Sequence, residues 1–338
     1  MARALMRSGL AGLVALPVTI GLASAAYQRF AERRDDRRFP PPGELIDIGD
    51  RRLHVLRSGT GDPVVVIVPA LGASAIEWAR VQRAVSAGSD ATVLVVDRGG
   101  LGWSDSAPWP RTPATMADEL EALLAALGID QPIILAGHSM GGLAARLYAA
   151  RHRGRVAHLV LVDSSHEDQG HVLPQFEPTE RARELWVRAV RHQSRLLGLY
   201  RLRAALGGLP ELRGDAEHEV PADLVDAHIA RSLTRAFRHA VVQELLGFRY
   251  GMRKPRDHAR NLGDLPITVI TGGTRISEQW FAGWCQLQKN FLTMSTRGQH
   301  LWTLHTGHHI NHDDPELLAA MFLDIINGTK LGISHRHA

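Results

Sequence analysis

Short, strongly hydrophobic runs recur along the chain and alternate with longer amphipathic stretches. The runs are continuous, which is typical of strands buried on both faces of a parallel sheet. The segments expected to form such strands are Pro63 to Ala70, Ala91 to Gly100, Pro132 to Ser139, Val156 to Ser165 and Pro266 to Gly273. Thr112 to Gly128 has leucines at helical spacing and Gly141 to His152 is rich in alanine, so both are expected to be helices. Strands that alternate with helices predict an α/β fold with a doubly wound, mostly parallel sheet.

Two stretches depart from this alternation. Leu45 to Gly59 contains two alternating runs around a Gly-Asp turn, the pattern of a β-hairpin. Residues 166–262 contain almost no strand signal and read as amphipathic, arginine-rich helices. An insertion at the carboxyl ends of parallel strands covers the side of the sheet where ligands bind. We therefore expect a core formed by residues 44–165 and 263–338, with a helical lid formed by residues 166–262.

Residues 1–43 have a different character. Ser8 to Tyr27 carries no charge over about the length that a helix needs to span a bilayer. We expect this segment to anchor the protein in a membrane and to be followed by an extended, solvated linker at Arg33 to Glu44. Two arginines precede the segment and five follow it, which favours a cytoplasmic main domain, a preference that the positive amino terminus reduces. Ala23 to Ala25 also fits a signal-peptidase site, and cleavage there would make the protein secreted.

Composition narrows the class of protein. Of the 338 residues, 45% are hydrophobic and 22% are charged, as in a globular domain. The net charge is only +4 and the basic residues are mixed with acidic ones, which argues against a nucleic-acid partner. The single cysteine, Cys285, allows neither an internal disulfide nor a zinc site built on thiolates. No pattern specifies an oligomeric state.

A Gly-x-Ser-x-Gly motif stands between a predicted strand and a predicted helix, with Gly137, Ser139 and Gly141 at its fixed positions. In this context the motif places the serine on a sharp strand-to-helix turn, and the glycines keep side chains out of the bend. Ser139 is therefore our candidate nucleophile. The alternative is a glycine-rich turn with an unreactive serine.

Around this motif, from about Leu45 to Asn327, the chain resembles the α/β-hydrolase superfamily, in particular its serine esterases and aminopeptidases. The resemblance implies a small-molecule substrate and no metal or organic cofactor. It also implies two backbone N–H groups for the oxyanion that forms when the serine attacks, those of Met140 and Leu71. Met140 follows the nucleophile, and Leu71 follows the first long strand. Where the family often has His-Gly before that second donor, this chain has Pro69-Ala70.

The resemblance further implies a histidine base. His308 follows Gly307 and precedes Pro315, as in the family's Gly-His…Pro pattern. A serine at neutral pH needs such an imidazole to remove its proton. His309 is the alternative base. A competing interpretation of the same loop is a metal cluster, although the spacing matches no recognised ligand motif; its members would be His305, His308, His309, His312 and Asp313.

The acid that orients the imidazole is often found after the strand at Pro266 to Gly273, but this chain has Thr274 and Arg275 there. Some members of the superfamily carry the acid after the strand that follows the nucleophile helix, where this chain has Asp163. Because parallel strand ends lie side by side, a carboxylate there reaches the same imidazole. Asp163 is our candidate acid, with a strand-end cap as its alternative role. The other candidate acids are Glu167, Asp168 and Glu278.

These residues together predict a serine hydrolase that acts on small carboxylic ester-like molecules through an acyl-enzyme. A serine at the elbow argues against epoxide hydrolase or dehalogenase chemistry, which in related proteins needs an aspartate and an alkyl-enzyme ester. Aminopeptidase, haloperoxidase and carbon–carbon hydrolase chemistry stay open, because the fold does not choose among them. The missing acid after Gly273 and the missing His-Gly pair also leave open a membrane-tethered binding protein without catalytic activity.

Overall fold

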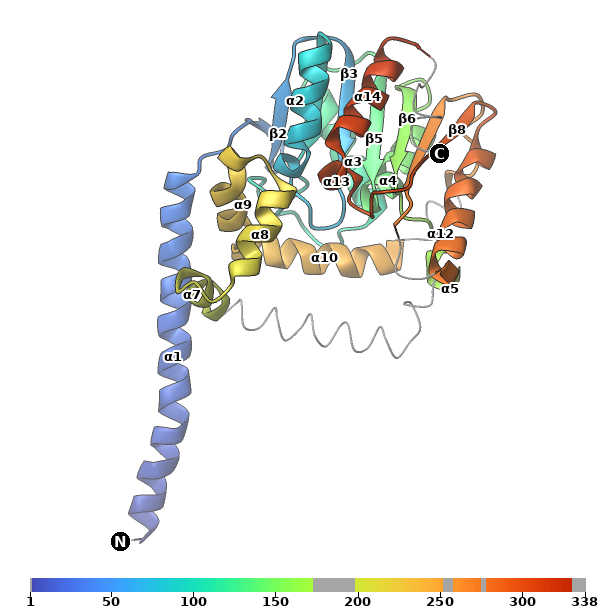
Figure 1. Ribbon diagram of the computed structural model, residues 1–338. Helices are drawn as coiled ribbons and strands as arrows, with labels where there is room; N and C mark the ends of the chain where they lie inside the picture. The colour runs from blue at the N-terminus through green and yellow to red at the C-terminus, as the bar shows by residue number, and fades with distance from the viewer. Residues whose placement is uncertain (1, 173–197, 252–257, 275–277, 330–338) are drawn as a thin grey trace.

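The centre of the molecule is an eight-stranded sheet in the order β1-β2-β4-β3-β5-β6-β7-β8. A computed structural model describes residues 2–172, 198–251, 258–274 and 278–329 of the chain (Figure 1). The pairs β1–β2 and β2–β4 are antiparallel, and all other neighbouring strands are parallel. The strands are β1 (Glu44–Asp47), β2 (Arg52–Ser58), β3 (Gly61–Val68), β4 (Ala91–Val96), β5 (Ile133–His138), β6 (Val156–Val162), β7 (Ile267–Gly272) and β8 (Gly298–Thr303).

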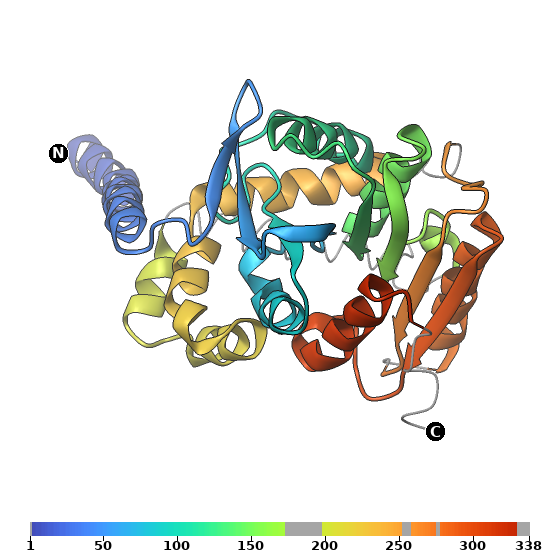
Figure 2. The same ribbon diagram turned by 90° about the horizontal axis from the view of Figure 1, so that it is seen from above.

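Helices cover both faces of this sheet (Figure 2). They are α2 (Ala79–Gly88), α3 (Pro113–Ala126), α4 (Met140–Arg151) and α14 (Pro315–Ile326). The apolar residues of α3 and α4 pack with strand residues such as Leu135 and Leu161 on one face. Those of α2 and α14 pack with residues such as Ile67 and Val95 on the other face. Successive strand residues point to opposite faces, so each continuous hydrophobic run contributes to both clusters.

The predicted α/β fold and its hydrophobic strands are confirmed. Each of the five predicted runs coincides with a strand, although β3 begins two residues before its run, and β1 and β2 form the predicted hairpin, in which Leu45 pairs with His54. The sequence did not predict β8. This strand lies at the edge of the sheet and is only partly buried, so its sequence, Gly-Gln-His-Leu-Trp-Thr, carries no continuous hydrophobic run.

The described residues between β6 and β7 form helices and no strand, as the pattern of residues 166–262 predicted. These helices are α5 (Gln169–Val172), α7 (Leu199–Ala205), α8 (Pro210–Glu219), α9 (Val225–Ser232) and α10 (Arg235–Gly251). Figure 1 shows α10 running across one end of the sheet. Residues 173–197 of the predicted lid lie outside the described part of the chain.

We predicted an extended linker at Arg33 to Glu44. This prediction is wrong for residues 33–38, which continue the long helix α1 (Ala2–Arg38). The physical reason is that one face of this helix packs against the rest of the protein. Gln28 and Asp35 are buried on the same side of α1, two turns apart. Gln28 Nε2 donates to the carbonyl oxygen of Leu233 at 2.8 Å, and Asp35 forms a buried ion pair with Arg201 of α7. A helix brings both side chains to one face, whereas an extended chain does not.

The membrane anchor expected at Ser8 to Tyr27 stays a prediction, because the side chains of residues 8–18 and 20 lie outside the described part of the structure. Among the described residues, no helix has both the length and the apolar character that crossing a membrane requires. The segment belongs to α1, whose N-terminal end extends away from the rest of the molecule (Figure 1).

Candidate active site

Ser139 lies on the turn between β5 and α4, with φ 52° and ψ −119°. A non-glycine residue with positive φ is strained, and such strain is concentrated at functional turns. The flanking glycines make this turn possible. A Cβ on Gly137 would lie 2.5 Å from the Cα of Gly142, and one on Gly141 would lie 2.2 Å from the carbonyl oxygen of Val68. The motif therefore forms the sharp turn that it predicts.

His308 lies on the loop between β8 and α13 (Ile310–Asp313), and its Nε2 is 3.0 Å from Ser139 Oγ. Its Nδ1 is 2.6 Å from Asp163 Oδ2. Because an ionised carboxylate can only accept, Nδ1 carries the hydrogen and Nε2 is free to accept from the serine hydroxyl. The backbone of His308 is also held, since His138 Nε2 donates to its carbonyl oxygen at 2.9 Å. The structure thus brings Ser139, His308 and Asp163 together in one line of contacts.

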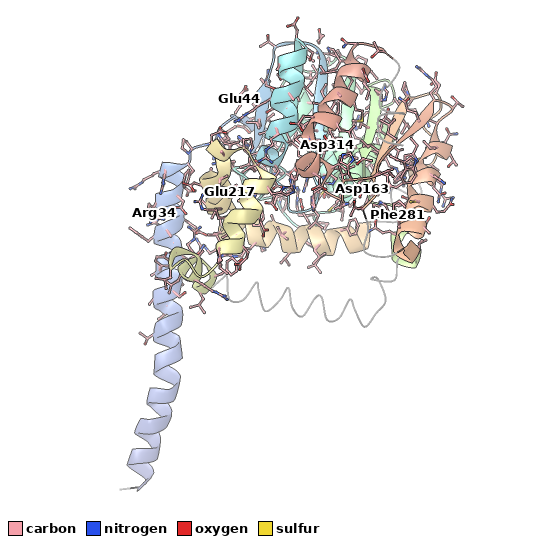
Figure 3. All side chains as sticks on the ribbon, viewed as in Figure 1. Arg34, Glu44, Asp163, Glu217, Phe281 and Asp314 are labelled. Carbon is pink, nitrogen blue, oxygen red and sulfur yellow. The ribbon has the colours of Figure 1, made fainter. Side chains whose placement is uncertain are left out.

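Asp163 directly follows β6 and is fully buried; Figure 3 labels it at the end of the sheet that faces α10. Its Oδ1 accepts from the backbone N–H of Gly272 at 3.1 Å and from the indole N–H of Trp284 at 3.0 Å. Together with His308, these donors replace the water that a buried charge loses. A Cβ on Gly272, at the end of β7, would lie only 1.9 Å from the carbonyl oxygen of Gly307. Asp163 thus follows the end of β6, and the end of β7 supplies a backbone hydrogen-bond donor to its carboxylate.

The structure places the alternative acids elsewhere. Glu167 forms a buried ion pair with Arg146 of α4 at 2.7 Å. Burial raises the pKa of Glu167, but hydrogen bonds and attraction to Arg146 outweigh it and lower the pKa to about 2. Asp168 is 41% exposed and lies 3.8 Å from His166. The side chain of Glu278 is outside the described part of the structure.

The neighbouring histidines of the loop have partners of their own. His309 stacks on His312 with ring centroids 5.1 Å apart. Burial and the nearby imidazoles lower the pKa of His309 to about 4. His305 Nε2 is 2.8 Å from Asp314 Oδ2, and His312 Nε2 is 3.6 Å from Glu77. In the part of the chain that the structure describes, no three or more histidine, cysteine, aspartate or glutamate side chains are grouped so that they could hold a metal ion.

Leu71 and Met140, the residues expected to supply the oxyanion donors, lie in one small hydrophobic cluster with Met116 and Ala144. A Cβ on Gly141 would lie 2.5 Å from the carbonyl oxygen of Pro69, so the loop that carries Leu71 touches the start of α4. Met140 opens that helix, where backbone N–H groups have no partner within the helix. Within the described residues, neither backbone N–H donates a hydrogen bond to the protein.

Sequence reasoning did not predict two of the polar contacts in this site. Ser165 Oγ lies 3.5 Å from Ser139 Oγ, and the backbone N–H of Ser165 donates to the carbonyl oxygen of Ser139 at 3.0 Å. Ser165 lies two residues after Asp163, at the end of a predicted strand, and this position could have indicated that its side chain lies near the site. Trp284, which donates to Asp163, is separated from it by 121 positions, and no local pattern points to that contact.

Comparisons with known sequences agree with this geometry at the level of the fold. The family model for the alpha/beta hydrolase fold matches residues 63–216. An AB hydrolase superfamily protein of Gibberella zeae is 27% identical over 295 residues, which cover 78% of this chain and 86% of that protein. Probable transporter efuK of Hormonema carpetanum is 37% identical over 142 residues, which cover 40% of this chain and 20% of that protein. The chain thus spans about a fifth of the length of this curated relative.

Solved structures agree as well. The epoxide hydrolase CorEH superposes with a TM-score of 0.62 at 19% identity, covering 84% of this chain and 97% of that one. A membrane phospholipase A, described as a novel bacterial virulence factor, superposes with a TM-score of 0.61 at 20% identity, covering 97% and 99%. At these identities the likeness concerns the fold alone. With its eight-stranded, mostly parallel sheet, the protein has the fold of the α/β-hydrolase superfamily, to which the family model assigns its residues 63–216.

Proposed function

We propose that the protein is a serine hydrolase that cleaves small carboxylic ester-like molecules through an acyl-enzyme. The observation that carries this proposal is the line of contacts from Ser139 Oγ to His308 Nε2 at 3.0 Å and from His308 Nδ1 to Asp163 Oδ2 at 2.6 Å. A nucleophile, a base and a group that orients the base are the parts that this chemistry needs. Hydrolases of the same fold, among them a phospholipase, support the general class.

In the acylation step, Ser139 Oγ attacks the carbonyl carbon of the ester while His308 Nε2 takes the hydroxyl proton. The carbonyl electron pair moves onto its oxygen, and we assign the N–H groups of Leu71 and Met140 to that oxyanion. Asp163 stabilises the imidazolium and fixes its orientation. The tetrahedral intermediate then collapses, the alcohol leaves with the proton from His308, and an ester of Ser139 is formed.

Deacylation repeats these steps with water as the nucleophile. His308 takes a proton from water, the hydroxide attacks the acyl carbon, and the same two N–H groups hold the oxyanion. Collapse returns the proton to Ser139 and releases a carboxylic acid. An aspartate nucleophile would form an alkyl ester instead, so the proposal does not extend to the epoxide opening of the structural neighbour.

We assign the helices between β6 and β7 to a lid that sets the size of the substrate. Support comes from their position, since α10 runs across the end of the sheet where Asp163 is labelled (Figures 1 and 3). Ligands of open α/β sheets bind at the carboxyl ends of the strands, which is also where Ser139 follows β5.

An active-site probe tests the proposed function. A fluorophosphonate is expected to label the wild-type protein, and p-nitrophenyl esters of increasing chain length are expected to be hydrolysed. Ser139→Ala should abolish labelling and lower kcat at least about a thousandfold. Ser165→Ala removes the neighbouring hydroxyl and should still be labelled. A folded wild-type protein that neither reacts with the probe nor cleaves any ester would instead support the non-catalytic binding protein.

A further inference from the structure

The loop that carries Leu71 is held by a buried arginine. Arg98, just after β4, is almost completely buried. Its two terminal nitrogens donate to the carbonyl oxygens of Pro69 and Ala70, each at 2.7 Å. The superfamily often has His-Gly at the positions of Pro69 and Ala70. The guanidinium of Arg98 therefore binds the two residues that replace the His-Gly pair.

A carboxylate from α10 completes this support. Glu244 is fully buried, and its two oxygens accept from Arg98 at 2.7 and 2.9 Å. One of these oxygens also accepts the backbone N–H of Gly72 at 2.9 Å. Burial lowers the pKa of Arg98, but attraction to Glu244 and hydrogen bonds with it outweigh that effect and raise the pKa, so the guanidinium stays charged. Hydrogen bonds from a charged guanidinium hold their acceptors more firmly than hydrogen bonds from a neutral donor do.

These contacts fix both peptide planes that flank Leu71. The carbonyl oxygen of Ala70 and the N–H of Leu71 belong to one planar, trans peptide, so they point in opposite directions. Arg98 holds the Ala70 carbonyl together with the backbone N–H of Ala73, which donates to the same oxygen at 2.9 Å, and these two donors therefore set the direction of the Leu71 N–H. Glu244 fixes the next peptide through the N–H of Gly72. An oxyanion site is effective when its N–H groups already point toward the position of the oxyanion, because these groups then need no reorientation during the reaction.

The helix that carries Glu244 lies tightly against these loops. A Cβ on Gly72, which has φ +72°, would lie 3.1 Å from a methyl group of Val241. A Cβ on Gly100 would lie 2.8 Å from the Cβ of Ala240. Both contact residues are on α10, so this helix packs closely against the backbone of the loops at these two glycines.

We propose that Arg98 and Glu244 are positioning residues that aim the Leu71 N–H at the oxyanion, so that α10 forms part of the catalytic frame. This inference rests on the proposed serine hydrolase function and adds to it the groups that replace the support of the missing His-Gly pair. It also assigns a catalytic consequence to a helix of the segment that the sequence predicted only as a lid.

The test compares transition-state stabilisation with ground-state binding. In Glu244→Gln and Arg98→Lys, kcat for a p-nitrophenyl ester is expected to fall about 10- to 100-fold with little change in KM. Affinity for an alkyl boronic acid, which forms a tetrahedral adduct on Ser139, should fall in parallel. Asp35→Asn serves as the matched control, because it removes a buried carboxylate from another arginine pair, that with Arg201. This control should keep both values within about twofold.

A double variant keeps the test decisive if a single variant does not fold. Arg98→Met with Glu244→Leu removes both charges together, which avoids a buried unpaired ion. It also removes both guanidinium donors, which leaves the N–H of Ala73 on the Ala70 carbonyl but no side-chain support of the loop by Arg98. Both kcat and boronate affinity should therefore remain low. Folded variants with wild-type kcat and boronate affinity would overturn the positioning role. If the wild type itself shows no labelling and no esterase activity, it is the proposed function that fails.

Discussion

At the scale of single residues, the surroundings of Asp163 favour its proposed role as the acid of the site. It accepts hydrogen bonds from three segments: the loop of His308, the end of β7 at Gly272, and Trp284 on α12 (Glu278–Asn290). Its backbone φ of 39° turns the chain sharply at the end of β6. The residue type and its place at a strand end are visible in the sequence, but the donors that hold the carboxylate are not.

Removing one of these donors should slow catalysis. Trp284→Phe keeps an aromatic ring but loses the N–H on Asp163 Oδ1. A hydrogen bond to a charged group contributes about 1.5–3 kcal/mol. Because the remaining donors still hold the carboxylate, we expect the lower part of that range, which is roughly a tenfold fall in kcat with KM nearly unchanged. Steady-state kinetics on a p-nitrophenyl ester measures both values.

Trp103→Phe is the matched control for this prediction. The indole N–H of Trp103 also donates a hydrogen bond, at 2.9 Å, but to the carbonyl oxygen of Phe39, away from Asp163. Its kcat should stay within about twofold of the wild-type value. Equal losses in the two variants would mean that Trp284 acts only through packing.

At the scale of elements, prediction succeeded where both faces of a segment are buried. β3 to β7 and the helices α3 and α4 have residues that meet the core from both sides or along one stripe, and this leaves a strong pattern in the sequence. β8 and residues 33–38 of α1 leave no such pattern. The first is a half-exposed edge strand, and the second is helical because of contacts with residues such as Arg201, which lies 166 positions from Asp35.

The segment after β6 provides an element-scale prediction about stability. Glu167 pairs with Arg146 and so ties the strand end that carries Asp163 to α4. Glu167→Gln leaves the buried guanidinium without its counter-ion, and we expect a loss of about 3 kcal/mol in the free energy of unfolding at pH 7. Urea denaturation measures this loss. Asp118→Asn, which breaks the exposed pair with Arg151, should cost less than about 1 kcal/mol.

The difference in the free energy of unfolding between the wild type and Glu167→Gln should depend on pH in a defined direction. The pKa of Glu167 is lowered from 4.5 to about 2 in the folded protein, chiefly by Arg146 acting against burial. Its contribution to stability is therefore complete above pH 4.5 and is lost as the pH falls toward 2. Glutamine does not titrate, so the difference in the free energy of unfolding between the wild type and Glu167→Gln should become smaller as the pH falls over that range. A gap that stays constant from pH 7 to pH 3 would contradict the assigned ionisation.

At the scale of the whole molecule, the candidate site was predictable because parallel strands end at one edge. β5 and β6 are neighbours, so Ser139 and Asp163 had to lie close together once each was placed at a strand end. The local sequence motifs located Ser139 and His308. The supports of the site could not be predicted, since contacts such as that between Arg98 and Glu244 join residues 146 positions apart and follow no periodicity.

The same distant packing joins α1 to the body of the molecule, and this can be tested at a pair of adjacent residues. Asp35 is buried against Arg201, whereas Asp36 is 57% exposed and pairs with Arg231 at the surface. Asp35→Asn leaves a buried arginine unpaired, which favours separation of α1 from α7. Hydrogen exchange of the backbone amides of residues 28–38 should then accelerate at least about tenfold.

Asp36→Asn should change this exchange little, because exposed ion pairs contribute less than about 1 kcal/mol. Neither variant changes Ser139, His308 or Asp163, so esterase activity should stay within about twofold in both. Equal exchange rates in the two variants would show that the buried face of α1 does not hold it in place. A loss of activity confined to Asp35→Asn would instead mean that the docked half of α1 supports the active site.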